Sequence, residues 1–483
     1  MRRLKHGEML PLEEGKRGYG KRAALKTRPF GYMFPDLQRD PANLLEDSKK
    51  TVTNLRRLGE VMLDPELGVI PGIPIPAIHT FFGQFIDHDI TLERGSASIQ
   101  LSDPRVLTLA EIATLIVNSR SPDLDLDSVY GPDINGVPSP RNPHNPEKML
   151  LGVVAKRDGL PPGKDIWNDL PRNDDGSPRI GDSRNDENIV TAQLHVALLR
   201  AHNTLVDRGH RFDAAQKLLR QHYQWLILDD FLNEIADPLI VKLIRQKGPR
   251  FFNPPPRSFF MPLEFSVAAY RFGHSKVRPA YDDFNNKHVS ATLDLLFRFT
   301  NEPLPDDWVI EWPLFLDPEE PRRFPRPIDT SLTRLLLELD PKQIPGQDPE
   351  RNLAVRNLIR GFILRLPTGQ AVARAMAAQG IRPLTPDQIA SVAYLIPGQL
   401  KVLEKTDFLT RTPLWFYILA EAAFYSRGQH LGPVGSTIVA EVLIAVMRNS
   451  TDSILVDPHW RPTLGNTPAE FSFEDLFKLA RVF

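Results

Sequence analysis

The most informative part of this 483-residue chain is the stretch Ile78-His79-Thr80-Phe81-Phe82-Gly83-Gln84-Phe85-Ile86-Asp87-His88-Asp89. It follows Pro76 and is mostly apolar, which predicts a buried helix that begins near the proline. At 3.6 residues per turn, Gln84, Asp87 and His88 lie on one side of this helix, and Asp89 is rotated about 100° from His88. Polar groups on a buried helix cost free energy unless each has a partner. The stretch therefore indicates either a core histidine oriented by a carboxylate or part of a functional site.

Three further segments carry polar residues at helical spacing. In residues 181–188, Asn185 or Ser183 is expected to cap a long helix, with Glu187 in its first turn. In residues 270–275, Arg271 and His274 are expected to share a face of a helix that Pro279 ends. The last segment is Arg356-Asn357-Leu358-Ile359-Arg360. Taken singly, each arginine is equally compatible with a solvated surface charge.

Together the four segments resemble the animal-type haem peroxidases, the superfamily of myeloperoxidase, thyroid peroxidase and the cyclooxygenases. Their order and internal spacing match, and the resemblance runs from about residue 70 to about residue 450. It implies a mainly α fold, with a single large helical haem-peroxidase domain at 69–483 and little β structure. Residues 1–68 carry none of the motifs and are expected to form an N-terminal arm.

On the distal side, the resemblance implies that His88 is the base that takes a proton from hydrogen peroxide and delivers it to the leaving oxygen. Gln84 matches the glutamine that hydrogen-bonds a ligand above the haem. Arg184 matches the distal arginine, whose fixed positive charge would stabilise negative charge as the O–O bond breaks.

On the proximal side, His274 matches the iron ligand of haem b. Asn357 matches the residue whose side-chain carbonyl accepts a hydrogen bond from the second N–H of that imidazole. Arg271 and Arg360 occupy positions that pair with haem propionates in the family.

Asp87 and Glu187 fall where mammalian members carry carboxylates that are esterified to haem methyl groups. Covalent attachment is therefore expected to be chemically possible. The sulfonium link of myeloperoxidase needs a methionine directly after that glutamate, and this chain has Asn188 there. No third covalent bond is expected.

A calcium site is implied by the acid-rich loop that begins at Ser121. By the family match, the ligands would be oxygens of Asp89, Ser121, Asp123, Asp125 and Asp127, with Asp123 contributing through its backbone carbonyl. Asp127 departs from the small hydroxyl residue that is common in mammalian members. A solvated acidic turn is the alternative.

Composition excludes several classes of function. The net charge is −1, which gives no electrostatic attraction to nucleic acid or to an anionic membrane, and no apolar stretch is long enough for a membrane span. The chain has no cysteine, and Met1 to Glu8 is basic without an apolar core, so we expect a cytoplasmic protein without a secretory signal. Non-classical export stays open. His195, His202 and His222 are expected to be structural.

Three functions are compatible with these residues. The first is a haem peroxidase that reduces hydrogen peroxide and oxidises a small organic donor or a halide. The second is a haem-dependent fatty-acid dioxygenase, which in the family places a radical tyrosine three residues before the proximal histidine. Here that position is Arg271, and the hydroxyl of the neighbouring Tyr270 is expected to face away. The third is a non-catalytic haem-binding relative, against which His88, Arg184 and His274 argue. The sequence does not specify the donor or the oligomeric state.

Overall fold

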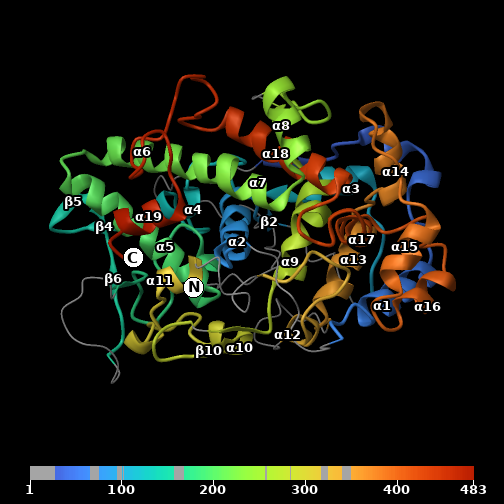
Figure 1. Ribbon diagram of the computed structural model, residues 1–483, viewed down its shortest axis with the longest axis horizontal. Coiled ribbons are helices and arrows are strands. Elements are labelled where there is room, and N and C mark those ends of the chain that lie inside the picture. Colours follow the sequence, from blue (N-terminus) through green and yellow to red (C-terminus); the bar gives the residue numbers. More distant parts are fainter. Residues whose placement is uncertain are drawn as a thin grey trace, which may run out of the picture.

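The computed structural model in Figure 1 describes residues 28–65, 75–94, 101, 103–156, 168–255, 258–282, 284–316, 325–339 and 350–483. The basic N-terminus and the expected domain boundary at residue 68 lie outside these ranges, so the division into an arm and a domain stays a prediction.

The described chain is mainly helical, as expected. The α-helices are α1 (Lys49–Glu60), α2 (Ile78–Ile90), α3 (Leu109–Leu115), α4 (Asp127–Tyr130), α5 (Ile189–Asp207), α6 (Phe212–Trp225), α7 (Leu232–Ile235), α8 (Pro238–Lys247), α9 (Gly273–Lys276), α10 (Leu293–Leu296), α11 (Trp312–Leu316), α12 (Arg334–Leu337), α13 (Leu353–Ile363), α14 (Gly369–Ala375), α15 (Pro386–Ala393), α16 (Gln399–Glu404), α17 (Leu414–Ser426), α18 (Pro433–Asn449) and α19 (Phe473–Leu479). Within the described ranges, no helix is both long and apolar enough to cross a membrane.

Strands in the described chain are short. A four-stranded sheet has the order β2 (Glu93–Arg94), β3 (Val117–Asn118), β1 (Arg28–Gly31) and β8 (Met261–Pro262), in which only the β1–β8 pair is parallel. The two-stranded pairs are β4 (Arg141–Asn142) with β5 (Asn145–Met149), β6 (Gly152–Val153) with β7 (Asn168–Asp169), and β9 (Ala280–Asp282) with β10 (Ser290–Thr292).

Helix α2 lies near the middle of the molecule and packs against α5 and α9 (Figure 1). Phe82 and Phe85 on α2 are almost completely buried. The ring of Phe82 meets that of Phe473 on α19, with centroids 4.8 Å apart. Burying such a side chain contributes about 1.5–3 kcal/mol. Apolar anchoring on most sides therefore holds the polar residues of α2 in place.

The start of α5 differs from the expectation. The N-cap is Asn188, whose side chain accepts a hydrogen bond from the Thr191 amide at 2.9 Å. Residues Ser183–Asp186 form a separate 3-10 helix, η3, which Asp182 caps by accepting from the Arg184 amide. The expected cap at Asn185 or Ser183 is therefore wrong, and Glu187 precedes α5, because the carboxylate of Asp182 stabilises a separate turn ahead of the long helix.

Three further apolar stretches of the sequence are also helical. The stretch 221–232 spans the end of α6, the π-helix η4 (Leu226–Phe231) and the start of α7. The stretches 413–422 and 432–443 fall within α17 and α18, and α18 begins with Pro433 in its first turn. Helix α19 is the last helix of the described chain.

The proximal segment is an irregular helical run. It consists of the π-helix η6 (Glu264–Ala268), the 3-10 helix η7 (Ala269–Phe272) and α9, and it becomes extended at Val277, ahead of Pro279. The indole nitrogen of Trp415 on α17 donates to the carbonyl of Arg271 at 3.2 Å. This run therefore ends where the proline predicts and is supported from α17.

The described part of the N-terminal segment belongs to the main core. Helix α1 packs against α13, and Leu55 and Leu58 are completely buried. The carboxylate of Glu264 accepts from the amides of Met33 at 2.9 Å and Phe34 at 3.1 Å. The hydroxyl of Tyr32 donates to the carbonyl of Leu364 at 2.8 Å. The segment therefore connects the elements that carry the candidate site.

Candidate functional site

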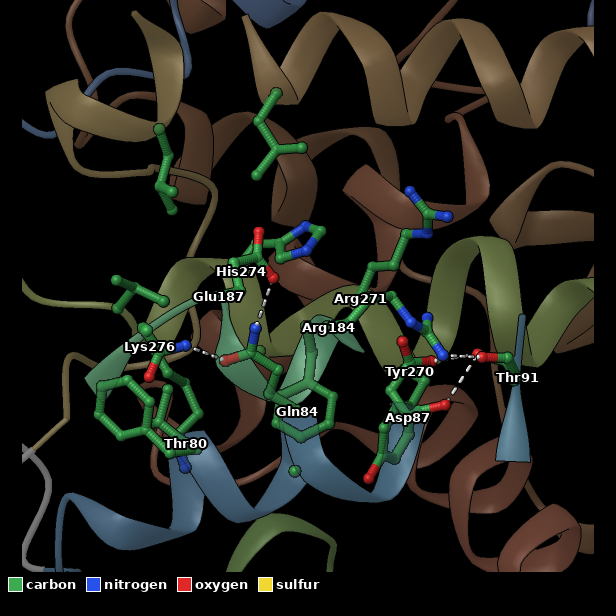
Figure 2. A pocket seen from close by; sticks show the side chains of 18 of the residues that line it. Thr80, Gln84, Asp87, Thr91, Arg184, Glu187, Tyr270, Arg271, His274 and Lys276 are labelled. Carbon is green, nitrogen blue, oxygen red and sulfur yellow. Dashed lines mark hydrogen bonds between the residues drawn. The ribbon is translucent and has the colours of Figure 1, made fainter. Parts of the chain in front are cut away.

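A cavity lies between α2, the run η7–α9 and the N-terminal approach to α5, and Figure 2 shows the side chains that line it. Most of the residues that the resemblance assigns to the haem site reach its wall: Gln84, Asp87, Arg184, Glu187, Arg271, His274 and Arg360. Segments separated by up to hundreds of residues are thus brought to one place. His88 and Asn357 are completely buried and are not part of the wall.

The proximal wall is organised by Asn357. Its amide nitrogen lies 2.9 Å from Nδ1 of His274, and its oxygen accepts a hydrogen bond from Arg271 at 2.7 Å. The expected pair of residues is therefore in contact, but the orientation differs from the expectation. Nδ1 of His274 faces a donor, because the side-chain oxygen of Asn357 is engaged by the guanidinium of Arg271.

One end of the cavity is strongly cationic. Arg271, Arg356 and Arg360 all line it, and Arg360 forms an ion pair with Glu93 at 2.8 Å. Burial, together with the charge of Arg360, lowers the pKa of Arg271 to about 10. Three guanidinium groups at a buried site favour an anionic ligand, because arginine binds carboxylates through paired hydrogen bonds. This end therefore fits the propionates of a haem.

The opposite wall carries the two carboxylates that the resemblance assigns to haem esters. The amide nitrogen of Gln84 donates to Glu187 at 3.1 Å, and the oxygen of Gln84 accepts from Asn188 at 3.0 Å. Asp87 accepts from the hydroxyl of Thr91 at 2.7 Å (Figure 2). Gln84 therefore fixes the position of Glu187 from α2, and both carboxylates are held on the wall of the cavity.

His88 belongs to a buried chain of three polar side chains. Its Nδ1 lies 2.8 Å from the oxygen of Asn185, and the amide nitrogen of Asn185 lies 3.0 Å from Nδ1 of His195. Burial lowers the pKa of His195 to about 3, so its ring is neutral at ordinary pH and Nδ1 can accept. The amide oxygen of Asn185 then accepts a hydrogen bond from the N–H at Nδ1 of His88, which leaves Nε2 of a neutral His88 as the basic nitrogen.

Sequence reasoning missed this function of Asn185, which was treated only as a helix cap. The available signal was a polar residue directly after Arg184, in a segment expected to approach a buried histidine. His195 was expected to be structural, and its contact with Asn185 connects it to the site as well.

Arg184 is anchored by Asp182, a residue that the sequence reading also missed. Its guanidinium donates to both carboxylate oxygens of Asp182, at 3.0 and 2.7 Å, and to the backbone carbonyls of His88 and Thr91. Burial alone would raise the pKa of Asp182, but Arg184 and Arg120 outweigh burial and hold it well below its usual range. The charge of Arg184 is therefore largely balanced within the protein.

Tyr270 differs from the expectation because it lines the same cavity as His274. Its ring stacks on Phe265 with centroids 4.7 Å apart, and its hydroxyl is buried without a hydrogen-bond partner among the described residues. Burial and the nearby charge of Asp87 raise its pKa well above the usual value. The tyrosine hydroxyl therefore belongs to the site region and does not face away from it.

The calcium ligands expected in the aspartate loop stay a prediction. Within the described ranges, no group of three or more acidic or histidine side chains is arranged to hold a metal ion. Both carboxylate oxygens of Asp89 accept hydrogen bonds from backbone amides, from Leu126 at 3.2 Å and from Ser128 at 3.0 Å. Asp123 accepts from the amide and hydroxyl of Thr451. Asp89 and Asp123 thus have hydrogen-bond partners within the protein.

His202 and His222 lie away from the cavity and have structural partners. His202 lies 3.0 Å from the hydroxyl of Tyr130 and 2.9 Å from the carbonyl of Glu147. Nε2 of His222 accepts hydrogen bonds from the backbone amides of Thr463 and Leu464. Both contacts agree with the structural function that was expected for these two residues.

The family model for animal haem peroxidase matches residues 105–304. That range contains Arg184, Glu187, Arg271 and His274, whereas α2 and α13 lie outside it. The structure of peroxidase A from Dictyostelium discoideum is similar along almost the whole chain, with a TM-score of 0.60, 17% identity and coverage of 97% of this chain and 98% of that chain. Residues 105–304 are therefore similar to the animal haem peroxidase family. The mainly α fold expected for the chain is confirmed.

Other proteins that are similar to this chain carry different names. The fatty acid alpha-dioxygenase of Oryza sativa has a TM-score of 0.57 at 10% identity, and the similarity covers 84% of this chain and 74% of that chain. The fatty acid alpha-dioxygenase of Arabidopsis thaliana has a TM-score of 0.55 at 12% identity, and the similarity covers 85% of this chain and 71% of that chain. A peroxidase-like protein of Margaritifera margaritifera is 28% identical over 180 residues, which are 34% of this chain and 22% of that protein. The chain thus spans about a fifth of the length of this relative.

The buried neutral state of His195 predicts a pH-dependent stability. Between about pH 6.5 and pH 3, the unfolded chain binds a proton at this residue and the folded chain does not, so stability falls as the pH is lowered. The loss should be about 1.4 kcal/mol per pH unit in this window. His195→Gln can still accept from Asn185 and should reduce the slope by that amount in urea unfolding at pH 6.5, 5.5 and 4.5. Equal slopes for the two proteins would contradict the assignment.

Proposed function

We propose that the chain is a haem peroxidase that reduces hydrogen peroxide and oxidises a small organic donor or a halide, with haem b bound through His274. The observation that carries the proposal is the cavity itself, which has His274 backed by Asn357 on one wall and Gln84 and Arg184 on the other. The cationic end of the cavity supplies partners for two propionates. Bound haem would supply an iron centre that binds peroxide and exchanges electrons with peroxide and with the donor.

His88 would move the proton that peroxide reduction requires. Asn185 keeps the proton of the neutral ring on Nδ1, so Nε2 can accept a proton from the oxygen of peroxide that binds first and return it to the leaving oxygen. His88 is completely buried, which excludes bulk water from this transfer. Asn185 therefore acts as a positioning residue for His88.

Arg184 would mainly fix the geometry of the distal side. Its contribution of net positive charge would be small. Its guanidinium binds the carbonyls of His88 and Thr91 at the end of α2 and is neutralised by Asp182. A cation at the C-terminus of a helix is favourable because the last carbonyls have no partner within the helix. The contact fixes the end of α2, and with it His88.

Binding of an anion at Arg271 would also affect His274. Arg271 now donates to the oxygen of Asn357. If its guanidinium turns to a propionate, the amide of Asn357 can rotate and offer its oxygen to the N–H of His274. This hydrogen bond would raise the electron density on the imidazole, as a peroxidase requires.

His274→Ala should yield protein without a Soret band after purification, because no other imidazole backed by Asn357 faces the cavity within the described ranges. A matched control is His79→Gln, which also changes a histidine of the cavity wall, one that pairs with Asp230 at 2.6 Å. The control should retain haem. The proximal assignment is wrong if His274→Ala keeps a full complement of haem with an unchanged absorption spectrum.

Covalent attachment through Asp87 and Glu187 is proposed to form on treatment with hydrogen peroxide. Each carboxylic acid and haem methyl group would lose one hydrogen as a C–O bond forms, and one peroxide would be reduced to two waters. Intact mass measurement of the peroxide-treated protein should show haem bound to the chain. Asp87→Asn and Glu187→Gln should each leave one ester. Haem that acidified butanone extracts completely after peroxide treatment would rule out the esters but not the peroxidase.

Fatty-acid dioxygenation is the second candidate function. The position of Tyr270 on the cavity wall supports it. The tyrosine lines the cavity, and structures of fatty acid alpha-dioxygenases share the fold. A dioxygenase needs an oxidisable side chain beside the haem, and Tyr270 has a buried hydroxyl there. The proposed donor would then be a lipid in place of a halide or a phenol.

Two variants separate these functions. For a peroxidase, His88→Ala should slow the reaction with hydrogen peroxide by about 10²–10⁴-fold while haem stays bound, since His88 does not ligate iron in this proposal. Tyr270→Phe should leave the rate of peroxide reduction within a few fold. Stopped-flow absorbance with hydrogen peroxide and oxygen uptake with a polyunsaturated fatty acid measure the two activities. The dioxygenase proposal replaces the peroxidase proposal if Tyr270→Phe abolishes oxygen uptake and His88→Ala leaves peroxide reduction intact.

A further inference from the structure

Arg326 is an almost completely buried arginine that lies between Pro325 and Pro327 in a segment without regular secondary structure. Proline has no backbone N–H, and it restricts the residue before it to an extended conformation. The amide of Arg326 is therefore the one backbone donor among these three residues, and it donates to the carbonyl of Lys276 at 3.0 Å. Neither the family resemblance nor the proposed reaction assigns a role to this arginine.

The guanidinium of Arg326 reaches the same end of the proximal segment. Its Nη1 donates to the carbonyl of Ser275 at 3.3 Å. Arg326 thus binds the last two carbonyls of α9, which have no partner within the helix because the chain becomes extended at Val277. A cation is favourable at the C-terminal end of a helical segment, where the carbonyl dipoles concentrate negative charge.

The guanidinium is itself held by several groups. Nη2 donates to the hydroxyl of Ser331 at 2.8 Å, and Nη1 donates to the carbonyl of Ser331 at 3.3 Å. Two carboxylates form ion pairs with it, Asp64 at 3.4 Å and Asp329 at 3.7 Å. Asp64 is also buried, so solvent screens this pair little. The position of the guanidinium is therefore fixed from outside the proximal segment.

Asp64 connects this contact to the N-terminal segment. The amide of Asp64 donates to the carbonyl of Leu332 at 2.9 Å, and the amide of Leu332 donates to the carbonyl of Met62 at 2.8 Å. Residues 62–64 and the segment that carries Arg326 are thus joined by backbone hydrogen bonds as well as by the ion pair.

His274 lies between two supports that come from other parts of the chain. Ahead of it, the indole of Trp415 donates to the carbonyl of Arg271. Directly after it, Arg326 binds the end of α9. A shift of either support would turn the short stretch of backbone that carries the imidazole, because no helical hydrogen bonds continue beyond α9.

We propose that Arg326 is a positioning residue for His274. It fixes the end of the proximal segment, and with it the orientation of the imidazole toward the haem iron, and Asp64 couples this contact to the N-terminal segment. The inference rests on the proposed function, in which His274 ligates the iron.

Resonance Raman spectra of the ferrous, haem-loaded protein test the proposal, because the iron–imidazole stretching band reports the bond from His274 to the iron independently of activity. Arg326→Met removes the guanidinium at similar length. Its band should broaden and shift to lower frequency, since the imidazole is no longer held in one orientation. Arg326→Lys keeps a cation that can reach one carbonyl and should reverse part of the shift. A band in Arg326→Met that coincides with the wild-type band would overturn the proposal.

Arg200→Met is the matched control. Arg200 is also a buried arginine, and it donates to the carbonyls of Ala480 and Arg481 at the end of α19, away from the cavity wall. The thermal midpoint of this control should fall, as that of Arg326→Met should, but its iron–imidazole band should match the wild-type band. A shift in the control as large as that in Arg326→Met would indicate general destabilisation and overturn the proposal.

If Arg326→Met does not fold, Asp64→Asn takes its place. The amide has the shape of the carboxylate but leaves Arg326 without its buried counter-charge, so the band should shift in the same direction, and an unchanged band would overturn the proposal. Absence of an iron–imidazole band in the wild-type protein would contradict ligation by His274, and the inference with it. A wild-type band that none of these variants shifts would remove only the role of Arg326.

Discussion

The distal side of the molecule depends on one buried carboxylate, that of Asp182. It accepts hydrogen bonds from Arg120 and Arg184, and the three groups are shielded from solvent. Removing one partner of such a buried pair costs about 3–5 kcal/mol, because the remaining charge has no water to solvate it. Arg184 in turn binds the last carbonyls of α2. The position of α2 against η3 thus follows from an electrostatic requirement as well as from apolar packing.

The two walls of the cavity are stabilised in different ways. On the distal wall, neutral amides do most of the positioning: Gln84 bridges Glu187 and Asn188, and Asn185 bridges His88 and His195. On the proximal wall, Asn357 contacts His274 through its amide nitrogen, while its amide oxygen is bound by the charged guanidinium of Arg271. An anion that binds Arg271 would compete with Asn357 for its guanidinium, whereas the amide contacts of Gln84 and Asn185 involve no arginine.

Much of the fold and the composition of the site could be predicted from the sequence, since the motifs are local. Helix α2 and the residues Gln84, Asp87 and His274 follow from spacing along one helix or from a resemblance in short segments. The missed residues act through long-range pairing. Asp182 and Arg120 are 62 residues apart, and nothing in either segment specifies that they meet. The capping error at Asn185 has the same origin, because that side chain is withdrawn from the backbone by a histidine on another helix.

The contacts of Tyr32, Met33 and Phe34 have a consequence for synthesis of the chain. Their partners lie 231 residues ahead at Glu264 for Met33 and 332 residues ahead at Leu364 for Tyr32. A ribosome that makes the chain from its N-terminus releases β1 long before either partner exists, and proteins are made at about 5–20 residues per second. Until β8 is made, the edge of β1 that pairs with it is exposed, the kind of surface that chaperones protect. The proximal wall can close only after most of the chain has emerged, so the cavity is completed late in the synthesis of this protein.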